Sequence, residues 1–210
     1  MTRQHSSPAE TEKQIIVSHP IPPVWNSESK ILILGTMPSP KSREAGFFYM
    51  HPQNRFWSVI AEVFEEKFEY KNNGIKADIA INSVTSQESA AAPDFSAAIT
   101  ERREFLLRHH LAMWDVVASC KITGAADSSI KNAIPNDFTK IFEGSKIHHI
   151  ICTGKTARNL WQKKCAALYE PRYNLTVHCL PSTSPANAQW SKEKLIKEFK
   201  VITKILISNS

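Results

Sequence analysis

The segment 30–35, KILILG, decides the fold class of this chain, because its four central residues are large and apolar and it ends at the turn residue Gly35. A short, continuous apolar run of this kind is typical of a β-strand buried on both faces, as the strands of a parallel sheet are. Three further runs of similar character follow along the chain, at 111–119, 146–154 and 174–181. The sequence therefore offers about four strands for one sheet.

Segments with helical periodicity lie between and after these runs, at 55–66, 98–110, 136–142, 155–168 and 191–207. In the last segment, Leu195, Phe199 and Ile202 recur at i, i+4 and i+7, as one face of an amphipathic helix requires. Strands that alternate with helices predict an α/β domain of three layers, in which helices cover both faces of a central, mostly parallel four-stranded sheet.

Two polar segments set the limits of this domain. Residues 1–28 are rich in Ser, Pro, Gln and Glu and have little apolar periodicity, so a disordered tail is expected there. Residues 29–208 are then expected to form a single domain. The polar stretch at about 67–97 is expected to be a surface insertion that is partly disordered.

Composition restricts the classes of function. No apolar run approaches the ~18–20 residues of a membrane span, and the first residues lack the apolar centre of a secretory signal, so an intracellular protein without a membrane partner is expected. The net charge of +6 favours a polyanionic partner. The four cysteines include no CxxC pair and the histidines lack metal-ligand spacing, so neither a metal nor a cofactor is expected.

Ligands of a parallel α/β fold bind beyond the carboxyl ends of its strands. The first strand is followed by GTMPSPKSREAGFFYMHPQNRFW, residues 35–57, which combines a Gly–Pro turn, aromatic rings and polar side chains. Such a combination suits a nucleobase, which offers a π-face for stacking and an edge for hydrogen bonds. A core cluster beneath a loop would use the same residue types, and the residues alone leave both interpretations open.

The segment TGKTA, residues 153–157, follows the third strand and opens a helix. A Walker A loop is not expected, because that motif needs a glycine five residues before Gly154, where His149 stands. Two interpretations remain. One is a helix N-terminus that binds a DNA phosphate at Lys155 and Thr156, and the other is an ordinary strand-to-helix turn.

Two blocks of the chain together resemble a known family. GTMPS at 35–39 followed by YMHPQNRFW at 49–57 resembles the first motif of the uracil-DNA glycosylase superfamily, and LPSTSPANA at 180–188 resembles its second. With SSIKNAIPND at 128–137 and CTGKTA at 152–157, these blocks are most similar to the hypoxanthine-DNA glycosylase family within that superfamily. The resemblance covers roughly residues 30–200, apart from 67–97.

The resemblance implies a uracil-DNA glycosylase-like fold and a monofunctional DNA N-glycosylase without cofactor. Such an enzyme hydrolyses the N-glycosidic bond of a deaminated base that is flipped out of double-stranded DNA, here most closely hypoxanthine. It implies a monomer that acts on genomic DNA, in the cytoplasm of a prokaryote or the nucleus of a eukaryote. The alternatives are a glycosylase for G/U or G/T mismatches, which releases uracil or thymine, and a catalytically inactive DNA-binding module.

Two positions depart from the pattern of the related uracil and thymine enzymes. Met37 stands where the mismatch-specific enzymes carry an Asn that positions the attacking water, and Leu180 stands where others carry a histidine. Both departures count against uracil or thymine as the substrate. The resemblance to the hypoxanthine family implies instead that the key amide is Asn54.

The candidate site follows from the resemblance and from the strand ends. We expect Asn54 to be catalytic and Tyr49 to stack on the base. The base pocket is expected to contain Gly35, Met37, Pro38, Tyr49 and Asn132, and the DNA contacts to come from Ser182, Ser184, Asn187, Lys155 and Thr156. Loop capping is the alternative role for Ser182 and Asn187. Asp115 is a candidate for polarising a water, although a strand-end aspartate that accepts from backbone amides is favoured.

Overall fold

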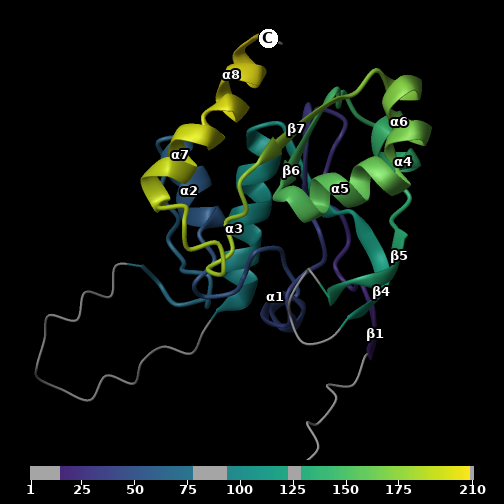
Figure 1. Cartoon of the computed structure of the whole chain (residues 1–210). Coiled ribbons are helices and arrows are strands. Elements are labelled where there is room, and N and C mark those ends of the chain that lie inside the picture. Colours follow the sequence, from purple (N-terminus) through teal and green to yellow (C-terminus); the bar gives the residue numbers. More distant parts are fainter. Residues whose placement is uncertain (1–14, 78–93, 123–128, 209–210) are drawn as a thin grey trace, which may run out of the picture.

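A computed structural model of the chain describes residues 15–77, 94–122 and 129–208. Its centre is a sheet of four strands in the order β3-β2-β6-β7, in which every neighbouring pair is parallel. The strands are β2 (Ile31–Gly35), β3 (Leu111–Asp115), β6 (His149–Thr153) and β7 (Thr176–Leu180). Helices lie on both faces of this sheet (Figure 1). The predicted α/β class with a four-stranded parallel sheet is confirmed.

Strand β2 is fully buried because its side chains alternate between two apolar clusters. Ile31 and Ile33 join one cluster, and Leu32 and Leu34 join the other. The first cluster is covered by α2 (Phe56–Val63), α3 (Phe95–Arg108), α7 (Lys192–Phe199) and α8 (Val201–Ser208). The second is covered by α4 (Thr139–Glu143), α5 (Lys155–Lys164) and α6 (Ala166–Tyr173).

The helices differ from the predicted segments mainly at their boundaries. Helix α3 begins earlier than expected, because the Asp94 side chain caps it by accepting from the Ala97 N–H. The predicted helix 155–168 is divided into α5 and α6 at Cys165, and the predicted helix 191–207 is divided into α7 and α8 at Lys200. A short helix, α1 (Pro40–Ala45), follows β2.

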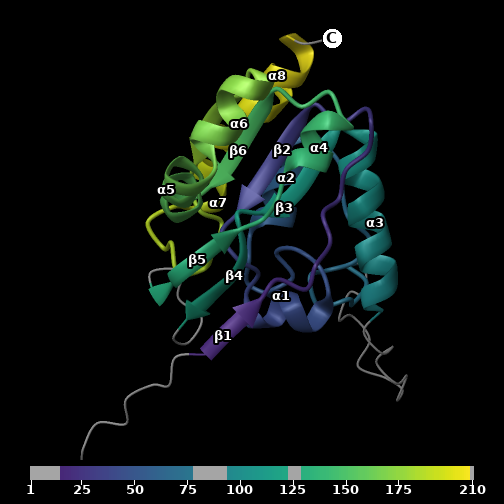
Figure 2. The ribbon, with the colours of Figure 1, turned by 90° about the vertical axis from the view of Figure 1, so that its right-hand side faces the viewer.

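A second sheet, which the sequence did not predict, lies beyond the carboxyl end of the parallel strands (Figure 2). It is antiparallel, in the order β1-β4-β5, and consists of β1 (Ile15–Ser18), β4 (Val117–Ile122) and β5 (Lys131–Pro135). The predicted strand 111–119 is thus two strands, β3 and β4. They separate at Val116, whose N–H donates to the Gly35 carbonyl.

The described residues 15–28 belong to the fold, so the expected tail at 1–28 is wrong for this part. Strand β1 pairs with β4, and Val24 exchanges two backbone hydrogen bonds with Met113 of β3. Part of the expected insertion at 67–97 is also built in, since Phe68 packs against the core and α3 includes Phe95. Residues 78–93 lie outside the described part of the chain. Within that part, no helix is long and apolar enough to cross a lipid bilayer.

Candidate active site

A cleft of about 730 Å³ opens at the carboxyl edge of the parallel sheet. The ends of β2, β3, β6 and β7 line it, together with α1, the start of α5 and the loop 181–190. Ten of the eleven site residues named from the sequence line this cleft: Gly35, Met37, Pro38, Tyr49, Asn54, Lys155, Thr156, Ser182, Ser184 and Asn187. The fold thus brings the two motif blocks together in one place.

Asn132 is the residue that does not line the cleft. It lies on β5 with an exposed side chain and a left-handed backbone, φ 52°. Its role in the base pocket stays a prediction. The preceding residues 123–128 lie outside the described part of the chain.

Asn54 is held by its side-chain oxygen. Oδ1 accepts hydrogen bonds from the Phe56 backbone N–H and from the Thr183 hydroxyl, both at 2.9 Å. A backbone N–H can only donate, so this contact fixes which end of the amide is the oxygen. Because both lone pairs of Oδ1 are engaged, Asn54 can act on a bound molecule only as a donor, through Nδ2.

Arg55 ties the first motif block to the loop that carries the second. Its guanidinium donates to the backbone carbonyls of Ser184 at 2.8 Å and Asn187 at 3.1 Å, and also to that of Trp190. Its backbone N–H and Nε both reach the Thr183 carbonyl, at 3.2 and 3.4 Å. The sequence did not single out Arg55, because its partners are backbone carbonyls. Every residue has a backbone carbonyl, so the residue types of the loop do not indicate these contacts.

The loop is further closed by its own side chains. Asn187 Nδ2 donates to the Ser182 carbonyl at 2.8 Å. The hydroxyl oxygens of Ser182 and Ser184 accept from backbone N–H groups two residues ahead, at 3.3 Å each. These contacts fit the loop-capping alternative, and they leave the two serine hydroxyl hydrogens available for donation.

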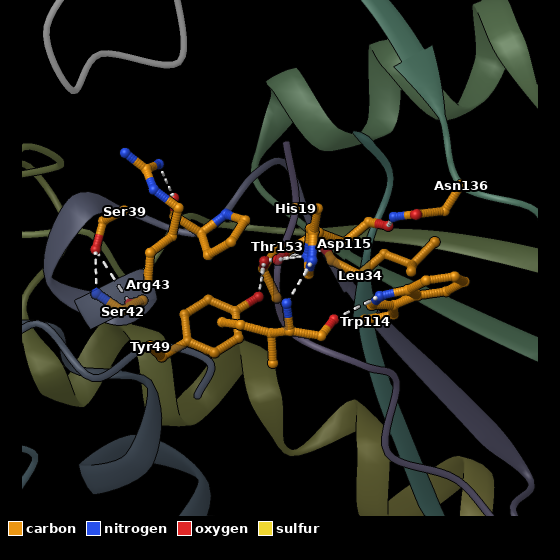
Figure 3. A network of polar contacts seen from close by, with 12 residues as sticks. His19, Leu34, Ser39, Ser42, Arg43, Tyr49, Trp114, Asp115, Asn136 and Thr153 are labelled. Atoms are coloured by element: carbon orange, nitrogen blue, oxygen red, sulfur yellow. Dashed lines mark hydrogen bonds and ion pairs between the residues drawn. The ribbon is translucent and has the colours of Figure 1, made fainter. Parts of the chain in front are cut away.

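Tyr49 lines the cleft. Its ring stacks on Phe56, with ring centroids 4.2 Å apart and planes 14° from parallel. Its hydroxyl donates to Thr153 Oγ1 at 2.7 Å, because the Thr153 hydrogen is given to the Leu34 carbonyl (Figure 3). A ring that is held in place by its hydroxyl and by a stacked neighbour suits the aromatic stacking expected of Tyr49.

The N-terminus of α5 forms one side of the cleft. Gly154 precedes it with φ 108°, and no side chain caps the helix. A β-carbon at Gly154 would lie 3.2 Å from Ser182 Cβ, so glycine lets α5 approach the loop closely. Lys155 is exposed at the first helical position. Uncapped N–H groups, the helix dipole and a lysine together favour an anion here.

Asp115, at the end of β3, is 4% exposed and lines the cleft. Its Oδ2 accepts from Nε2 of His19 at 2.8 Å, and His19 Nδ1 accepts from the Ile21 N–H at 3.2 Å. Among the described residues, no backbone amide donates to this carboxylate, so the favoured strand-end capping role is not what the structure shows. Sequence reasoning missed His19 because it lies in the segment taken for a tail.

Two other kinds of chemistry find little support in the described residues. Cys179 lines the cleft, but burial raises the pKa of its thiol, as it raises the pKa of the Cys152 and Cys165 thiols to about 12. Thiolates are therefore scarce at neutral pH. Nowhere in the described part of the chain do three or more His, Cys, Asp or Glu side chains gather as metal ligands.

Comparisons with known proteins agree with this geometry. The family model of the Uracil DNA glycosylase superfamily matches residues 22–206. A hypoxanthine DNA glycosylase of Methanosarcina acetivorans is 24% identical over 182 residues, which are 85% of this chain and 94% of the relative. One of Methanosarcina barkeri is 28% identical over 118 residues, 56% of this chain and 58% of the relative. A solution NMR structure from M. acetivorans, described as a candidate uracil DNA glycosylase, superposes with a TM-score of 0.62 at 23% identity and covers 90% of this chain and 99% of its own.

Proposed function

The chain belongs to the uracil DNA glycosylase superfamily, and from this premise we propose that it is a DNA glycosylase that removes hypoxanthine from deoxyinosine in double-stranded DNA. The names of both Methanosarcina relatives support hypoxanthine as the base. We propose that the protein acts as a monomer on genomic DNA inside the cell, without a metal or cofactor.

The observation that carries this proposal is the fixed amide of Asn54 in the same cleft as the Tyr49 ring. Hydrolysis of an N-glycosidic bond passes through an oxocarbenium-like sugar while negative charge grows on the departing base. A hydrogen-bond donor that is already oriented stabilises that charge without reorganisation. Asn54 Nδ2 is such a donor, because two hydrogen bonds hold Oδ1.

The same amide supports discrimination between hypoxanthine and adenine. Hypoxanthine carries the acceptor O6 where adenine carries an amino group. An amide N–H directed at that position donates a hydrogen bond to O6 of hypoxanthine. In adenine it meets the amino group, which is also a donor, so the amide N–H and the amino group are both left without an acceptor. An unpaired buried donor costs about 1–3 kcal/mol. The target base must also leave the stack, and this costs least at a mispaired nucleotide.

The backbone of the flanking nucleotides is expected to lie along the N-terminus of α5 and the loop 181–190. Lys155 and Thr156 are placed there to bind a phosphate, and the free hydroxyl hydrogens of Ser182 and Ser184 are placed to donate to another. Uracil and thymine stay less favoured, since Met37 replaces the Asn that the mismatch-specific enzymes use.

Base release in a single turnover tests the proposal. Duplex oligonucleotides carry one deoxyinosine, one deoxyuridine or one G·T mismatch, and alkali converts each abasic site into a strand break. We expect cleavage at inosine, and a loss on the order of 100-fold in the Asn54→Ala variant, the loss typical of one such donor. Release of uracil or thymine alone would contradict the assigned base, and DNA binding without release of any base would favour an inactive binding module.

Asn73→Ala is a matched control. Like Asn54, Asn73 accepts with Oδ1 from the backbone N–H two residues ahead, that of Ile75, but it lies outside the cleft. Both substitutions remove a side-chain hydrogen bond to the backbone N–H two residues ahead, so a general effect of this loss on folding would appear in both variants. We expect Asn73→Ala to release hypoxanthine at the wild-type rate.

A further inference from the structure

The turn that carries Asn54 is held by Asn72, a residue of the stretch 67–97 that was expected to be a surface insertion. Asn72 donates through Nδ2 to two backbone carbonyls, that of Asn54 at 2.9 Å and that of His51 at 3.1 Å. The His51 carbonyl also accepts from the Asn54 N–H at 2.8 Å, which closes the turn 51–54. An amide nitrogen has two hydrogens, so Asn72 uses both to join the two ends of this turn.

Asn72 contacts this turn from the side opposite to the cleft. Asn54 lines both the cleft and a second cavity of about 610 Å³, and it thus forms part of the wall between the two. Asn72 and Arg102 line the second cavity and do not line the cleft. The Thr183 hydroxyl contacts the Asn54 side chain, whereas Asn72 contacts its backbone. A base in the cleft is therefore affected by Asn72 through the turn and not by direct contact.

Arg102 of α3 fixes the orientation of the Asn72 amide. Its Nη2 donates to Asn72 Oδ1 at 3.3 Å and to the Tyr70 carbonyl at 2.9 Å. A guanidinium group has no acceptor, so this contact identifies the oxygen of the Asn72 amide and leaves Nδ2 to face the turn. Arg102 is itself anchored within α3, since its Nη1 donates to the Ala98 carbonyl at 2.9 Å.

The guanidinium group of Arg102 is buried. The residue is 1% exposed, and its guanidinium carbon lies 5.4 Å from the ring centroid of Trp57 and 5.1 Å from that of Phe68. Burial lowers the pKa of Arg102 to about 10, so the group stays charged at neutral pH. An apolar side chain would fill this site without burying a charge. What arginine adds is a set of directed donors, and one of them holds Asn72.

Helix α3 holds the neighbouring backbone at two further points. The Glu101 carboxylate accepts from the backbone N–H groups of Glu69 and Tyr70. The Gly74 carbonyl accepts from the Asp94 N–H at 2.9 Å, and a β-carbon on Gly74 would lie 2.9 Å from the Asp94 carbonyl carbon. This backbone is thus anchored to a helix on both sides of the side chain that reaches the turn.

We propose that Asn72 is a positioning residue for base release, which holds the turn 51–54 so that the Asn54 donor meets the departing base, and that Arg102 orients Asn72. This inference rests on the proposed glycosylase function and on the part of Asn54 in it. Misplacing a reacting group by about 1 Å can cost on the order of 100-fold in rate. The side chain and the backbone of Asn54 are held by different residues, so loss of the backbone contact leaves the donor less well placed.

Asn72→Ala tests the proposal in the single-turnover assay. We expect release of hypoxanthine to slow at least about tenfold, while the Kd of the inosine duplex stays within about a factor of three, because Asn72 does not line the cleft. Asn73→Ala is the matched control. Asn73 also lines the second cavity, but its Oδ1 accepts from the Ile75 N–H, and the variant should keep the wild-type rate.

A double variant separates positioning from a general loss of stability. If Asn72 acts through Asn54, Asn72→Ala should slow the Asn54→Ala variant by less than about twofold, because two changes to one shared contact are not additive. A residue with only a structural role would slow wild-type protein and Asn54→Ala by the same factor. Equal factors would therefore overturn the inference.

Asn72→Asp keeps the contact with Arg102 and removes the contacts with the turn. Its carboxylate can still accept from Arg102, but it has no N–H to donate to the carbonyls of His51 and Asn54. We expect it to unfold at a urea concentration no lower than Asn72→Ala does, and to release hypoxanthine at least about tenfold more slowly than wild-type protein. Release at the wild-type rate would show that the two donor contacts are not needed.

Arg102→Lys tests the orienting role. An ammonium group cannot reproduce the planar set of donors that reaches Asn72 and the carbonyls of Tyr70 and Ala98. We expect this change to slow base release in wild-type protein and to slow Asn72→Ala by less than about twofold. The same loss in both backgrounds would refute the part assigned to Arg102.

The outcomes distinguish the inference from the proposed function. If wild-type protein releases hypoxanthine and Asn72→Ala matches it, Asn72 has no positioning role. If Asn54→Ala keeps the wild-type rate, Asn54 is not the donor and the inference fails with it. If wild-type protein releases no base from any duplex, the proposed function fails before any variant is considered.

Discussion

Gly35 shows at the scale of one residue how tightly the cleft is built. It ends β2, and any side chain there would enter the space that Asp115 and Tyr49 occupy. The resemblance named Gly35 as pocket wall, but the reason lies in a close approach that only the folded chain creates. The carboxylate and the ring can lie side by side because no β-carbon separates them.

Gly35→Ala is therefore expected to impair both stability and activity. Overpacking of this kind typically costs about 1–3 kcal/mol in the free energy of unfolding, and displacement of Asp115 or Tyr49 should slow base release. Urea unfolding and single-turnover assays measure the two effects. Gly46→Ala provides the comparison, since Gly46 has φ 75° and open space around it. That variant should lose stability through backbone strain and keep its rate, whereas wild-type behaviour of Gly35→Ala would contradict the close approach.

The resemblance named Tyr49 and Asn54, because both stand in a motif block that the sequence preserves. The motifs could not name His19 or Thr183, whose side chains each make one hydrogen bond to a distant residue of the cleft. Nor could they show that Oδ1 of Asn54 is occupied. The identity of a side chain limits its possible roles, and its hydrogen-bond partners select among them.

At the scale of elements, the apolar run 31–34 could be recognised from the sequence as a buried strand, because both faces of β2 are buried and its apolar pattern is continuous. Strand β1 could not be recognised from the sequence, since it is short, mostly exposed and followed by prolines at 20, 22 and 23. The run 111–119 is apolar across the junction of β3 and β4, so periodicity could not show that the chain changes sheets there. Both failures concern the antiparallel sheet, which depends on pairing between distant segments.

Helix α5 is expected to contribute to DNA affinity through its first turn. Replacing Lys155 with Ala should weaken binding of any duplex, with or without inosine, and should reduce the slope of log Kd against log salt concentration by about one. Fluorescence anisotropy at several salt concentrations measures this slope. Lys204→Ala, on α8 away from the cleft, should leave it unchanged. An unaltered slope in Lys155→Ala would exclude a phosphate contact by this side chain.

The loop 181–190 is expected to depend on Arg55 for its shape. In Arg55→Ala, the carbonyls of Ser184, Asn187 and Trp190 lose their shared donor, so amide hydrogen exchange in the loop should rise and base release should fall at least tenfold. Arg55→Lys should restore little, because an ammonium group cannot reproduce the planar set of donors. Exchange in α6, which Arg55 does not contact, serves as the internal reference.

For the whole molecule, the sheet separates two apolar cores, and each should contribute to stability independently of the cleft. Phe199 of α7 is fully buried and meets Phe56 edge to face at 6.2 Å. Phe199→Ala is expected to cost about 3–5 kcal/mol in the free energy of unfolding, measured with urea. Leu168→Ala, at a position that is 58% exposed, should change it by less than about 0.5 kcal/mol. Comparable losses in both would contradict this assignment of the core.

Stability is also expected to fall in mild acid because of a histidine pair on β6 and β7. His149 Nδ1 lies 3.3 Å from His178 Nε2. Burial lowers the pKa of both, and for His149 the charge of His178 lowers the pKa further. As the pH falls, the unfolded chain therefore binds protons at these two histidines before the folded chain does. Their effect on the free energy of unfolding is absent above about pH 6.5, and below that pH the free energy of unfolding declines.

The melting temperature at pH 5 and pH 7.5 measures this effect. We expect a lower value at pH 5, and a smaller difference between the two conditions in His178→Gln than in wild-type protein. The variant removes one of the two groups and relieves the other of a neighbouring charge. An identical pH dependence in both proteins would show that the acid sensitivity arises elsewhere.

The contacts of Arg55 also constrain when the protein can become active during its synthesis. Arg55 and Asn54 leave the ribosome early, but their partners Thr183, Ser184 and Trp190 lie 128 to 135 residues later in the chain. At translation rates of roughly 5–20 residues per second, the early motif waits about 6 to 27 seconds for them. A nascent chain that has completed β2, β3 and β6 thus has much of its sheet and no finished cleft. The cleft can form only after the loop up to Trp190 has been synthesised, so a chain interrupted before that point has no cleft with which to release a base.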